Sequence, residues 1–431
     1  MDLASKLFKG DRVIWIIFMF FCLISLVEVF SATSTLAYKN ANHWAPIVRH
    51  ASFLLGGFVV ILVIHNFPSK YFSLLIIFLP ISIVLLLLAP YIGVEINDTT
   101  RWIKLFGIQF QPSEIAKLSL IVFTAFMLSL RNRFTEKQIF NTILIAAGVT
   151  CGIIFGDNIS TAVMLFGICY LMMFIGQLPF WRVFRLGAIL LASLALFLFL
   201  LYVTPVDVIQ KLPDRLEGRL LTAKGRIERA IHPPEEKVDA NGVIVITDDH
   251  YQEIHAKIAI ARGGVVGKMP GHGQQRDFLP QAYSDFIYAI IIEELGIVGG
   301  LFVLLLYVIL LFRVGIIARR CESSFAKFLV MGCGLVIVVQ AFANMAVAVD
   351  LIPVTGQPLP LISRGGTSTL ITCVYIGIIL SISRFGAGMG NEEDELLEEE
   401  MEGVLQTDMS DQEIESVLAS IEVETIEEAN V

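Results

Sequence analysis

Residues 13–33, VIWIIFMFFCLISLVEVFSAT, form an apolar run that carries a single charge, Glu28. As a helix, a run of about twenty residues crosses the hydrocarbon core of a bilayer, which is about 30 Å thick. The run exceeds the hydrophobic region of a signal peptide, and no convincing small-residue cleavage site follows it. We therefore expect it to stay in the protein as a first membrane-spanning helix.

The rest of the chain repeats this pattern. Hydrophobic residues make up 56% of the 431 residues and the mean hydropathy is +0.75, whereas soluble domains have roughly 45–50% apolar residues. Apolar runs predict ten spans, at residues 13–34, 47–65, 71–91, 113–130, 139–155, 159–177, 184–204, 286–312, 326–349 and 367–386. The predicted fold is an all-α polytopic membrane protein of about ten helices, with a large extracytoplasmic loop, residues 205–285, between helices 7 and 8.

The distribution of Lys and Arg predicts the orientation, because short cytoplasmic loops are enriched in these residues. On one side of the predicted spans they occur at residues 6–12, 70, 131–137, 182–185, 313–327 and 384. The other side carries Lys39, Arg49, Arg101, Lys104 and Arg364. Both termini should therefore be cytoplasmic, with residues 1–12 before a membrane domain at 13–390. Loops 92–112, 205–285 and 350–366 should lie together in the periplasm.

The acidic residues are concentrated at the end of the chain. Sixteen of the forty Asp and Glu residues lie after residue 390, where there is no Lys or Arg, so the rest of the chain is net basic. Self-repulsion should keep much of this tail, residues 391–431, disordered in the cytoplasm. A basic membrane domain suits anionic lipid head groups, and we expect no nucleic-acid partner.

A first polar constellation flanks the fourth span. It comprises Asn97-Asp98-Thr99-Thr100-Arg101-Trp102-Ile103, then Gln111-Pro112-Ser113-Glu114-Ile115-Ala116-Lys117. Pro112 is typical of a helix start, and Glu114 and Lys117 are then three residues apart on one face, where they can pair. One interpretation is a buried ion pair that holds helices together. The other is a cationic cradle, in which Arg101 and Lys117 face a diphosphate.

A second constellation lies at the start of the eighth span. Asp285 stands where the polar loop enters the membrane, a setting that can raise the pKa of a carboxyl toward that of a working base. Asp is also a preferred helix N-cap, so a capping role stays open. Glu293 and Glu294 lie deeper in the span, where a charge is costly and internal pairing is the default expectation.

The third constellation, Pro353 to Ser368, reads PVTGQPLPLISRGGTS. Its prolines and glycines exclude a continuous helix, so we expect a packed re-entrant or cavity-lining loop. Its free amides could bind an anion. The six cysteines lie in apolar runs or, for Cys321, in a basic loop, which predicts neither a disulfide framework nor a zinc site.

These motifs together resemble the FtsW/RodA family of peptidoglycan glycosyltransferases, in the family's order and over roughly residues 13–386. The resemblance rests on Arg-Trp-Ile with Gln-Pro-Ser-Glu-x-x-Lys, the Gly263-Gly264 loop, Ser-Asp-Phe-Ile with Glu-Glu-Leu-Gly, and Pro-Val-Thr-Gly-x-Pro-Leu-Pro-Leu-Ile-Ser-x-Gly-Gly. It departs from the family at Tyr283-Ser284, where His-Thr is usual, and at Arg364, where Tyr is usual. Both departures affect expected substrate contacts rather than the expected mechanism.

The resemblance implies a membrane enzyme of the bacterial inner membrane that polymerises lipid II, with Asp285 as the catalytic residue and general base. It implies substrate binding by Arg101, Trp102, Gln111, Ser113, Glu114, Lys117, Ser363, Arg364, Gly365 and Gly366. No cofactor is certain and no metal site is assigned, although a divalent cation, Mg²⁺ or Mn²⁺, could assist. The implied partners are a class B penicillin-binding protein transpeptidase and other divisome proteins, at the division septum.

Three other interpretations stay open at this point. A lipid II flippase would need a polar cavity but not one indispensable outer carboxylate. A scaffold that recruits a transpeptidase would leave each outer polar residue replaceable. Within the family, the acidic tail and overall similarity favour the cell-division branch over the elongation branch.

Overall fold

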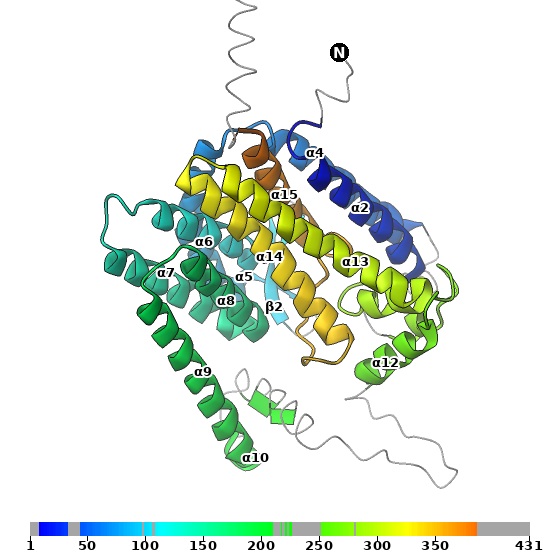
Figure 1. Cartoon of the computed structure of the whole chain (residues 1–431). Helices are drawn as coiled ribbons and strands as arrows, with labels where there is room; N and C mark the ends of the chain where they lie inside the picture. The colour runs from blue at the N-terminus through cyan, green and yellow to red at the C-terminus, as the bar shows by residue number, and fades with distance from the viewer. Residues whose placement is uncertain are drawn as a thin grey trace, which may run out of the picture.

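The structure, a computed structural model, describes residues 8–32, 44–96, 99–105, 108–209, 217, 220–221, 224–225, 251–279 and 282–385. It is a bundle of long helices with one small sheet at one end (Figure 1). The predictions for residues 1–7, for most of 205–250 and for the acidic tail 391–431 lie outside the described residues.

The ten predicted spans are confirmed as helices of the described chain. Nine are long and apolar enough to cross a membrane, and α8 is a shorter apolar helix. They are α2 (Arg12–Ala32), α4 (Ala45–Ile64), η1 with α5 (Ser69–Ile77 and Phe78–Ile92), α6 (Pro112–Ser129), α7 (Glu136–Asp157), α8 (Ile159–Ile175), α9 (Phe180–Val203), α13 (Ile287–Arg320), α14 (Ser324–Ala348) and α15 (Thr367–Phe385). Shorter helices are α10 (Val206–Ile209), α12 (Tyr251–Gly263) and η3 (Gln275–Asp277).

Polar residues just before the helices explain where several of them begin. Asp11 accepts hydrogen bonds from the amides at the start of α2, and Asn158 accepts one from the Thr161 amide in α8. Thr135 and Gln138 form a capping box at the start of α7, while Pro112 opens α6. Such caps satisfy amides that a helix cannot pair internally.

The predicted all-α fold class is confirmed, and a small three-stranded antiparallel sheet that was not predicted adds to it. Strands β1 (Val94–Ile96), β2 (Thr99–Leu105) and β3 (Ile108–Phe110) lie in that order between α5 and α6, in the segment expected to be a loop. Two of the strands have only three residues, too few for an alternating pattern to be recognised in the sequence. The sheet packs on α5 and α6 and so fixes the approach to α6.

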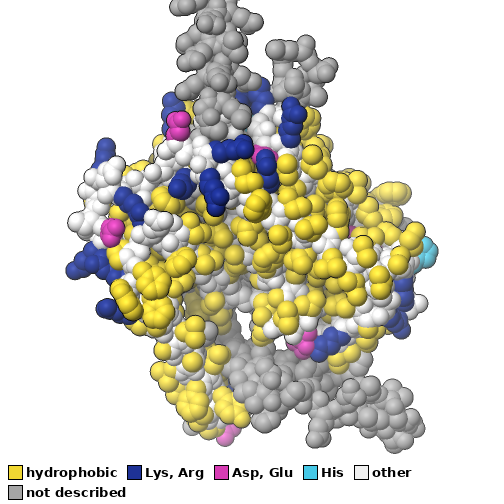
Figure 2. All heavy atoms as spheres, viewed as in Figure 1, with side chains coloured by type: hydrophobic (Ala, Val, Ile, Leu, Met, Phe, Trp, Pro, Cys, Tyr) yellow, Lys and Arg dark blue, Asp and Glu magenta, His cyan; other side chains and the backbone are white. Residues whose placement is uncertain are grey.

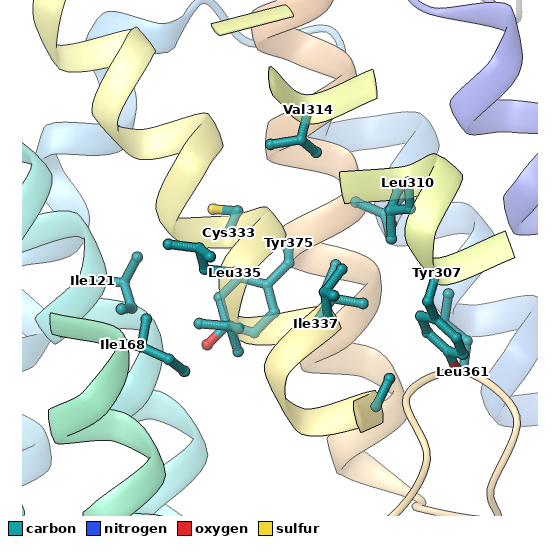
Figure 3. Packing of buried hydrophobic residues seen from close by; sticks show 14 of the residues in the cluster. Ile121, Ile168, Tyr307, Leu310, Val314, Cys333, Leu335, Ile337, Leu361 and Tyr375 are labelled. Carbon is teal, nitrogen blue, oxygen red and sulfur yellow. The ribbon is translucent and has the colours of Figure 1, made fainter. Parts of the chain in front are cut away.

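Helix α14 lies at the centre of the bundle and packs against α6, α8, α13 and α15. Figure 3 shows side chains of these helices around Cys333, Leu335 and Ile337 of α14. By contrast, α9 extends away from the bundle, and large apolar side chains along it are exposed (Figure 1). Lipid is the natural environment for such a helix surface.

The two ends of the described chain meet on one face, here called the inner face. The Asp11 amide donates to Ser383 Oγ at 2.9 Å, and Asp11 also pairs with Arg313 of α13. An even number of spans requires this arrangement. Figure 2 shows Lys and Arg side chains gathered above a broad apolar band, at the end of the molecule where Figure 1 shows the start of α2 and the end of α15.

Candidate functional site

The candidate site lies at the opposite end of the bundle, the outer face, where three segments meet. These are residues 282–286 before α13, the irregular loop 350–366 between α14 and α15, and the outer half of α14. The prediction of a packed non-helical loop is confirmed, because Leu359, Leu361 and Ile362 are buried. Residues 359–363 of the loop therefore belong to the protein core, whereas residues 350–353 are exposed.

Backbone and hydroxyl contacts hold this loop against the Asp285 segment. Ser363 Oγ donates to the Ser284 carbonyl at 2.6 Å and accepts from the Leu359 amide at 2.8 Å. The Arg364 amide donates to the Tyr283 carbonyl at 2.9 Å. The structure thus brings the predicted residues Ser363 and Arg364, with Gly365 and Gly366 following, beside Asp285.

Asp285 is half-buried, and its surroundings argue against a capping role. Helix α13 begins at Ile287 and Phe286 occupies the N-cap position, so Asp285 is not the N-cap residue. Ser284 Oγ donates to Asp285 Oδ1 at 2.9 Å. A Cβ atom built on Gly356, whose φ is +65°, would lie 3.9 Å from Asp285 Oδ2. A side chain at this position would make an ordinary van der Waals contact with that oxygen.

Two amide side chains of α14, Gln340 and Asn344, hold the neighbouring backbone in place. Asn344 Nδ2 donates to the carbonyls of Asp285 and Gln357, both at 2.9 Å. One turn away, Gln340 Nε2 donates to the Pro358 carbonyl at 2.9 Å. We call Gln340 and Asn344 the amide pair. It fixes the loop and the Asp285 segment to the same face of the central helix.

Sequence reasoning missed the amide pair, although a signal was present. The two amides stand four residues apart in an otherwise apolar span, so they share one helix face. Polar side chains inside a membrane helix are costly and usually functional. Attention to that spacing would have placed α14 at the site.

Glu114 and Lys117 form the predicted ion pair, with Lys117 Nζ 2.7 Å from Glu114 Oε1. The Lys117 side chain is fully buried, and its Nζ also lies 3.5 Å from Gln340 Oε1, at the long limit of a hydrogen bond. A buried ammonium whose charge is balanced in this way favours the ion-pair interpretation. The pair is nevertheless connected to the site, because Gln340 belongs to the amide pair.

Arg364 places a cation beside the Asp285 segment. Its guanidinium lies over the Tyr283 ring, 5.3 Å from the centroid. Burial lowers the pKa of Arg364 from its usual range; Tyr283 opposes this and Arg49 adds to it. No carboxylate among the described residues forms an ion pair with Arg364, so its charge is available to an anionic ligand.

The remaining predicted residues lie around the start of α6. Arg101 and Trp102 belong to β2, and the side chain of Arg101 is outside the described part of the structure. The register pairs Ile103 with Phe110, and one further step brings Trp102 opposite Gln111, the N-cap residue of α6. Ser113 follows in the first turn.

Several buried polar atoms near these elements have no hydrogen-bond partner among the described residues. They are Ser113 Oγ, Asn344 Oδ1, Thr355 Oγ1, Thr367 Oγ1 and Tyr375 Oη. An unpaired buried polar group costs about 1–3 kcal/mol, so such atoms are expected to pair with a polar ligand or water. The residues that the structure describes contain no group of three or more His, Cys, Asp or Glu side chains able to hold a metal.

Comparisons with known proteins agree with this architecture. A family model described as "Cell cycle protein", FTSW_RODA_SPOVE, matches residues 11–387. The chain is 32% identical to a probable peptidoglycan glycosyltransferase FtsW of Haemophilus influenzae, over 86% of this chain and 90% of the relative. It is 30% identical to the protein of the same name from Nitrosococcus halophilus, over 84% and 89%.

Solved structures share the fold at lower sequence identity. One chain of a peptidoglycan synthase complex that coordinates polymerisation and crosslinking has a TM-score of 0.67 and 23% identity, over 87% of this chain and 98% of its own length. The rod shape determining protein RodA of Thermus thermophilus has a TM-score of 0.58 and 21% identity, over 88% and 97%.

Proposed function

Because the chain belongs to the FtsW/RodA/SpoVE family of cell cycle proteins, we propose that it is a peptidoglycan glycosyltransferase. It polymerises lipid II into glycan strands during septal cell-wall synthesis. Two relatives that match most of the chain carry the glycosyltransferase activity in their names. A polar network at the outer end of a membrane bundle suits a substrate with a lipid tail and a polar head group.

In this reaction the 4-hydroxyl of the acceptor lipid II attacks the anomeric carbon of the donor glycan. A bond forms between that carbon and the hydroxyl oxygen, the bond to the pyrophosphate oxygen breaks, and undecaprenyl pyrophosphate leaves. Asp285 takes the proton of the hydroxyl as general base. This assistance contributes roughly 10²–10⁴-fold, so positioning and charge stabilisation must supply the rest.

The observation that carries the assignment of Asp285 is the hydrogen bond that its carbonyl accepts from Asn344, one member of the amide pair. Asn344 and Ser363 fix the backbone on either side of the carboxylate. A base must be held in one position, and these contacts support that part of the proposal. Arg364 is the proposed counter-charge for the pyrophosphate. Arg101 stays a candidate for the same role.

Replacing Asp285 by Asn tests the proposal, because the amide keeps the size of the side chain and cannot accept the proton. We expect Asp285→Asn protein to fold and bind lipid II but to form no glycan chains from labelled lipid II. Asp207→Asn is the matched control, since Asp207 is an exposed carboxylate in α10 beyond the outer end of α9. It should polymerise at the wild-type rate.

Two results would contradict the assignment. Normal chain formation by folded Asp285→Asn protein would exclude Asp285 as the base. Transport of lipid II across vesicles by wild-type protein that makes no glycan would favour the flippase alternative.

The proposal extends to partners and location. A single-span class B penicillin-binding protein is the proposed transpeptidase partner, and the structural likeness to a chain of a synthase complex supports it. The proposed location is the bacterial inner membrane at the division septum, with both termini cytoplasmic. The Lys and Arg residues of the inner face support that orientation.

A further inference from the structure

Helix α13 is broken near its outer end, and a loop that precedes it fills the break. Gly296 has φ 72° and ψ −177°, which no helix accommodates. Amides of Lys268 and Met269 donate to the carbonyls of Glu293 and Glu294 at 3.1 and 2.8 Å, and the Ile297 amide donates to the Gly264 carbonyl at 3.0 Å. The loop thus satisfies backbone groups that the break releases.

The carboxylates beside the break hold the next part of the same segment. Glu293 accepts hydrogen bonds from the amides of Gln274 and Gln275 at 3.0 and 3.1 Å. Glu294 Oε2 accepts from the Gly271 amide at 3.1 Å. Both glutamates are fully buried, and carboxylate-to-amide hydrogen bonds are among the stronger ones.

Glu294 also joins this segment to the first span. Ser31 Oγ of α2 donates to Glu294 Oε1 at 2.5 Å, and Arg276 donates to the same Ser31 oxygen at 2.6 Å. The Arg276 guanidinium lies 3.7 Å from Glu294. One carboxylate therefore connects α13, α2 and residues 271–276.

The segment held in this way continues directly to Asp285. The Leu279 amide donates to the Gln275 carbonyl at 2.9 Å, and the Ala282 amide donates to the Leu279 carbonyl at 3.2 Å. These two hydrogen bonds connect Gln275 through Leu279 to Ala282, three residues before Asp285, while residues 280 and 281 lie outside the described part of the structure. A displacement of residues 271–277 is therefore expected to move Asp285.

We propose that Glu294, assisted by Glu293, is a positioning residue that sets the location of Asp285 by fixing residues 271–277 to α13 and α2. The proposal rests on the proposed function, because it assumes that Asp285 reacts. Glu294 itself does not touch the substrate. Its loss should lower the turnover number for lipid II and leave lipid II affinity nearly unchanged.

The geometry at Gly273 allows a reversible test. A Cβ atom built on Gly273 lies 3.1 Å from Cγ of Glu294, which is close to where Glu294→Cys would place its sulfur. A disulfide requires Cβ atoms about 3.5–4.5 Å apart, and this arrangement is compatible with that. The double variant Gly273→Cys, Glu294→Cys should therefore replace the carboxylate connection by a covalent one.

We expect Glu294→Cys alone to lose about a hundredfold in turnover, the scale of a 1 Å misplacement of a catalytic group. The oxidised double variant should recover most of that activity and lose it again when a reductant is added. The wild-type protein, with and without reductant, controls for the native cysteines. The reduced double variant controls for the new side chain at Gly273, because Gly273→Cys alone would place a Cβ atom 2.9 Å from Glu294 Oε1 and 3.0 Å from Glu293 Oε2. Lipid II binding is measured on every sample.

The proposal is overturned if Glu294→Cys turns over at the wild-type rate, or if the cross-linked double variant is as inactive as the reduced one. Should Glu294→Cys fail to fold, Glu294→Gln takes its place, since it keeps the size and one acceptor oxygen. It should lower turnover without changing lipid II affinity, and unchanged turnover would again overturn the proposal. If wild-type protein makes no glycan at all, the proposed function itself has failed.

Discussion

A single side chain, Asn344, joins the two segments that form the candidate site. Its Nδ2 group donates to carbonyls 72 residues apart in the chain, those of Asp285 and Gln357. At this scale the sequence predicts which loops meet at the candidate site, because Asp285, Ser363 and Arg364 interrupt apolar runs. The spacing of Gln340 and Asn344 indicates a polar face on α14, but it does not predict which carbonyls Asn344 contacts, since that depends on the fold.

Replacing Asn344 by Asp should uncouple these segments with almost no change in volume. An ionised carboxylate cannot donate, so both carbonyls lose their partner, and each unsatisfied group costs about 1–3 kcal/mol. We expect a lower unfolding temperature in detergent together with a large loss of glycan synthesis. Asn66→Asp is the control, because Asn66 also donates to a carbonyl, that of Leu62, but does so at an exposed position near the inner face where water can replace the bond. Wild-type stability of Asn344→Asp would show that the two contacts contribute nothing.

At the scale of elements, hydropathy locates the ten apolar helices of the described residues, nine of which are long and apolar enough to cross a membrane. The small sheet and the break in α13 were not predicted, since both depend on partners distant in the chain. The pair Glu114–Lys117 could be predicted in part. Its spacing on α6 predicts the contact, but only the bundle shows that Lys117 is fully buried and next to Gln340.

Removing one member of that pair should destabilise α6 strongly. Lys117→Met leaves Glu114 unpaired, and breaking a buried pair costs about 3–5 kcal/mol. The double change Glu114→Gln, Lys117→Met should restore most of the unfolding free energy. Lys257→Met is the matched control, because Lys257 pairs with Asp350 at an exposed site, where the loss is about 0–1 kcal/mol.

Activity of the double variant then distinguishes the two interpretations of the pair. A stable double variant that polymerises lipid II shows a structural ion pair, which is the result we expect. A stable but inactive one would instead show that the ammonium acts on the substrate.

At the scale of the whole molecule, the site and the chain ends lie on opposite faces. Even span number and the Lys and Arg asymmetry predict that the termini share one side, and the contact between Asp11 and Ser383 agrees. Only the distribution of Lys and Arg assigns each face to a compartment. That assignment can be measured directly.

Thiol labelling in intact spheroplasts provides that measurement. In a Cys321→Ser background, Val266→Cys should react with an impermeant reagent before lysis, because Val266 is 77% exposed on the outer face. Glu322→Cys, exposed after α13 on the inner face, should react only after lysis. The reverse pattern would invert the proposed topology.

The filled break in α13 also constrains how the gene can change. A Cβ atom at Gly263, Gly267 or Gly296 would lie 2.0–2.3 Å from a backbone oxygen of the facing segment. This distance is too short for any side chain to fit. Every amino acid that one base change can introduce at a glycine codon carries a Cβ atom. Apart from synonymous changes, no single-base substitution at these three codons is therefore expected to be neutral, and a drug that bound this backbone junction would leave the bacterium few escape mutations there.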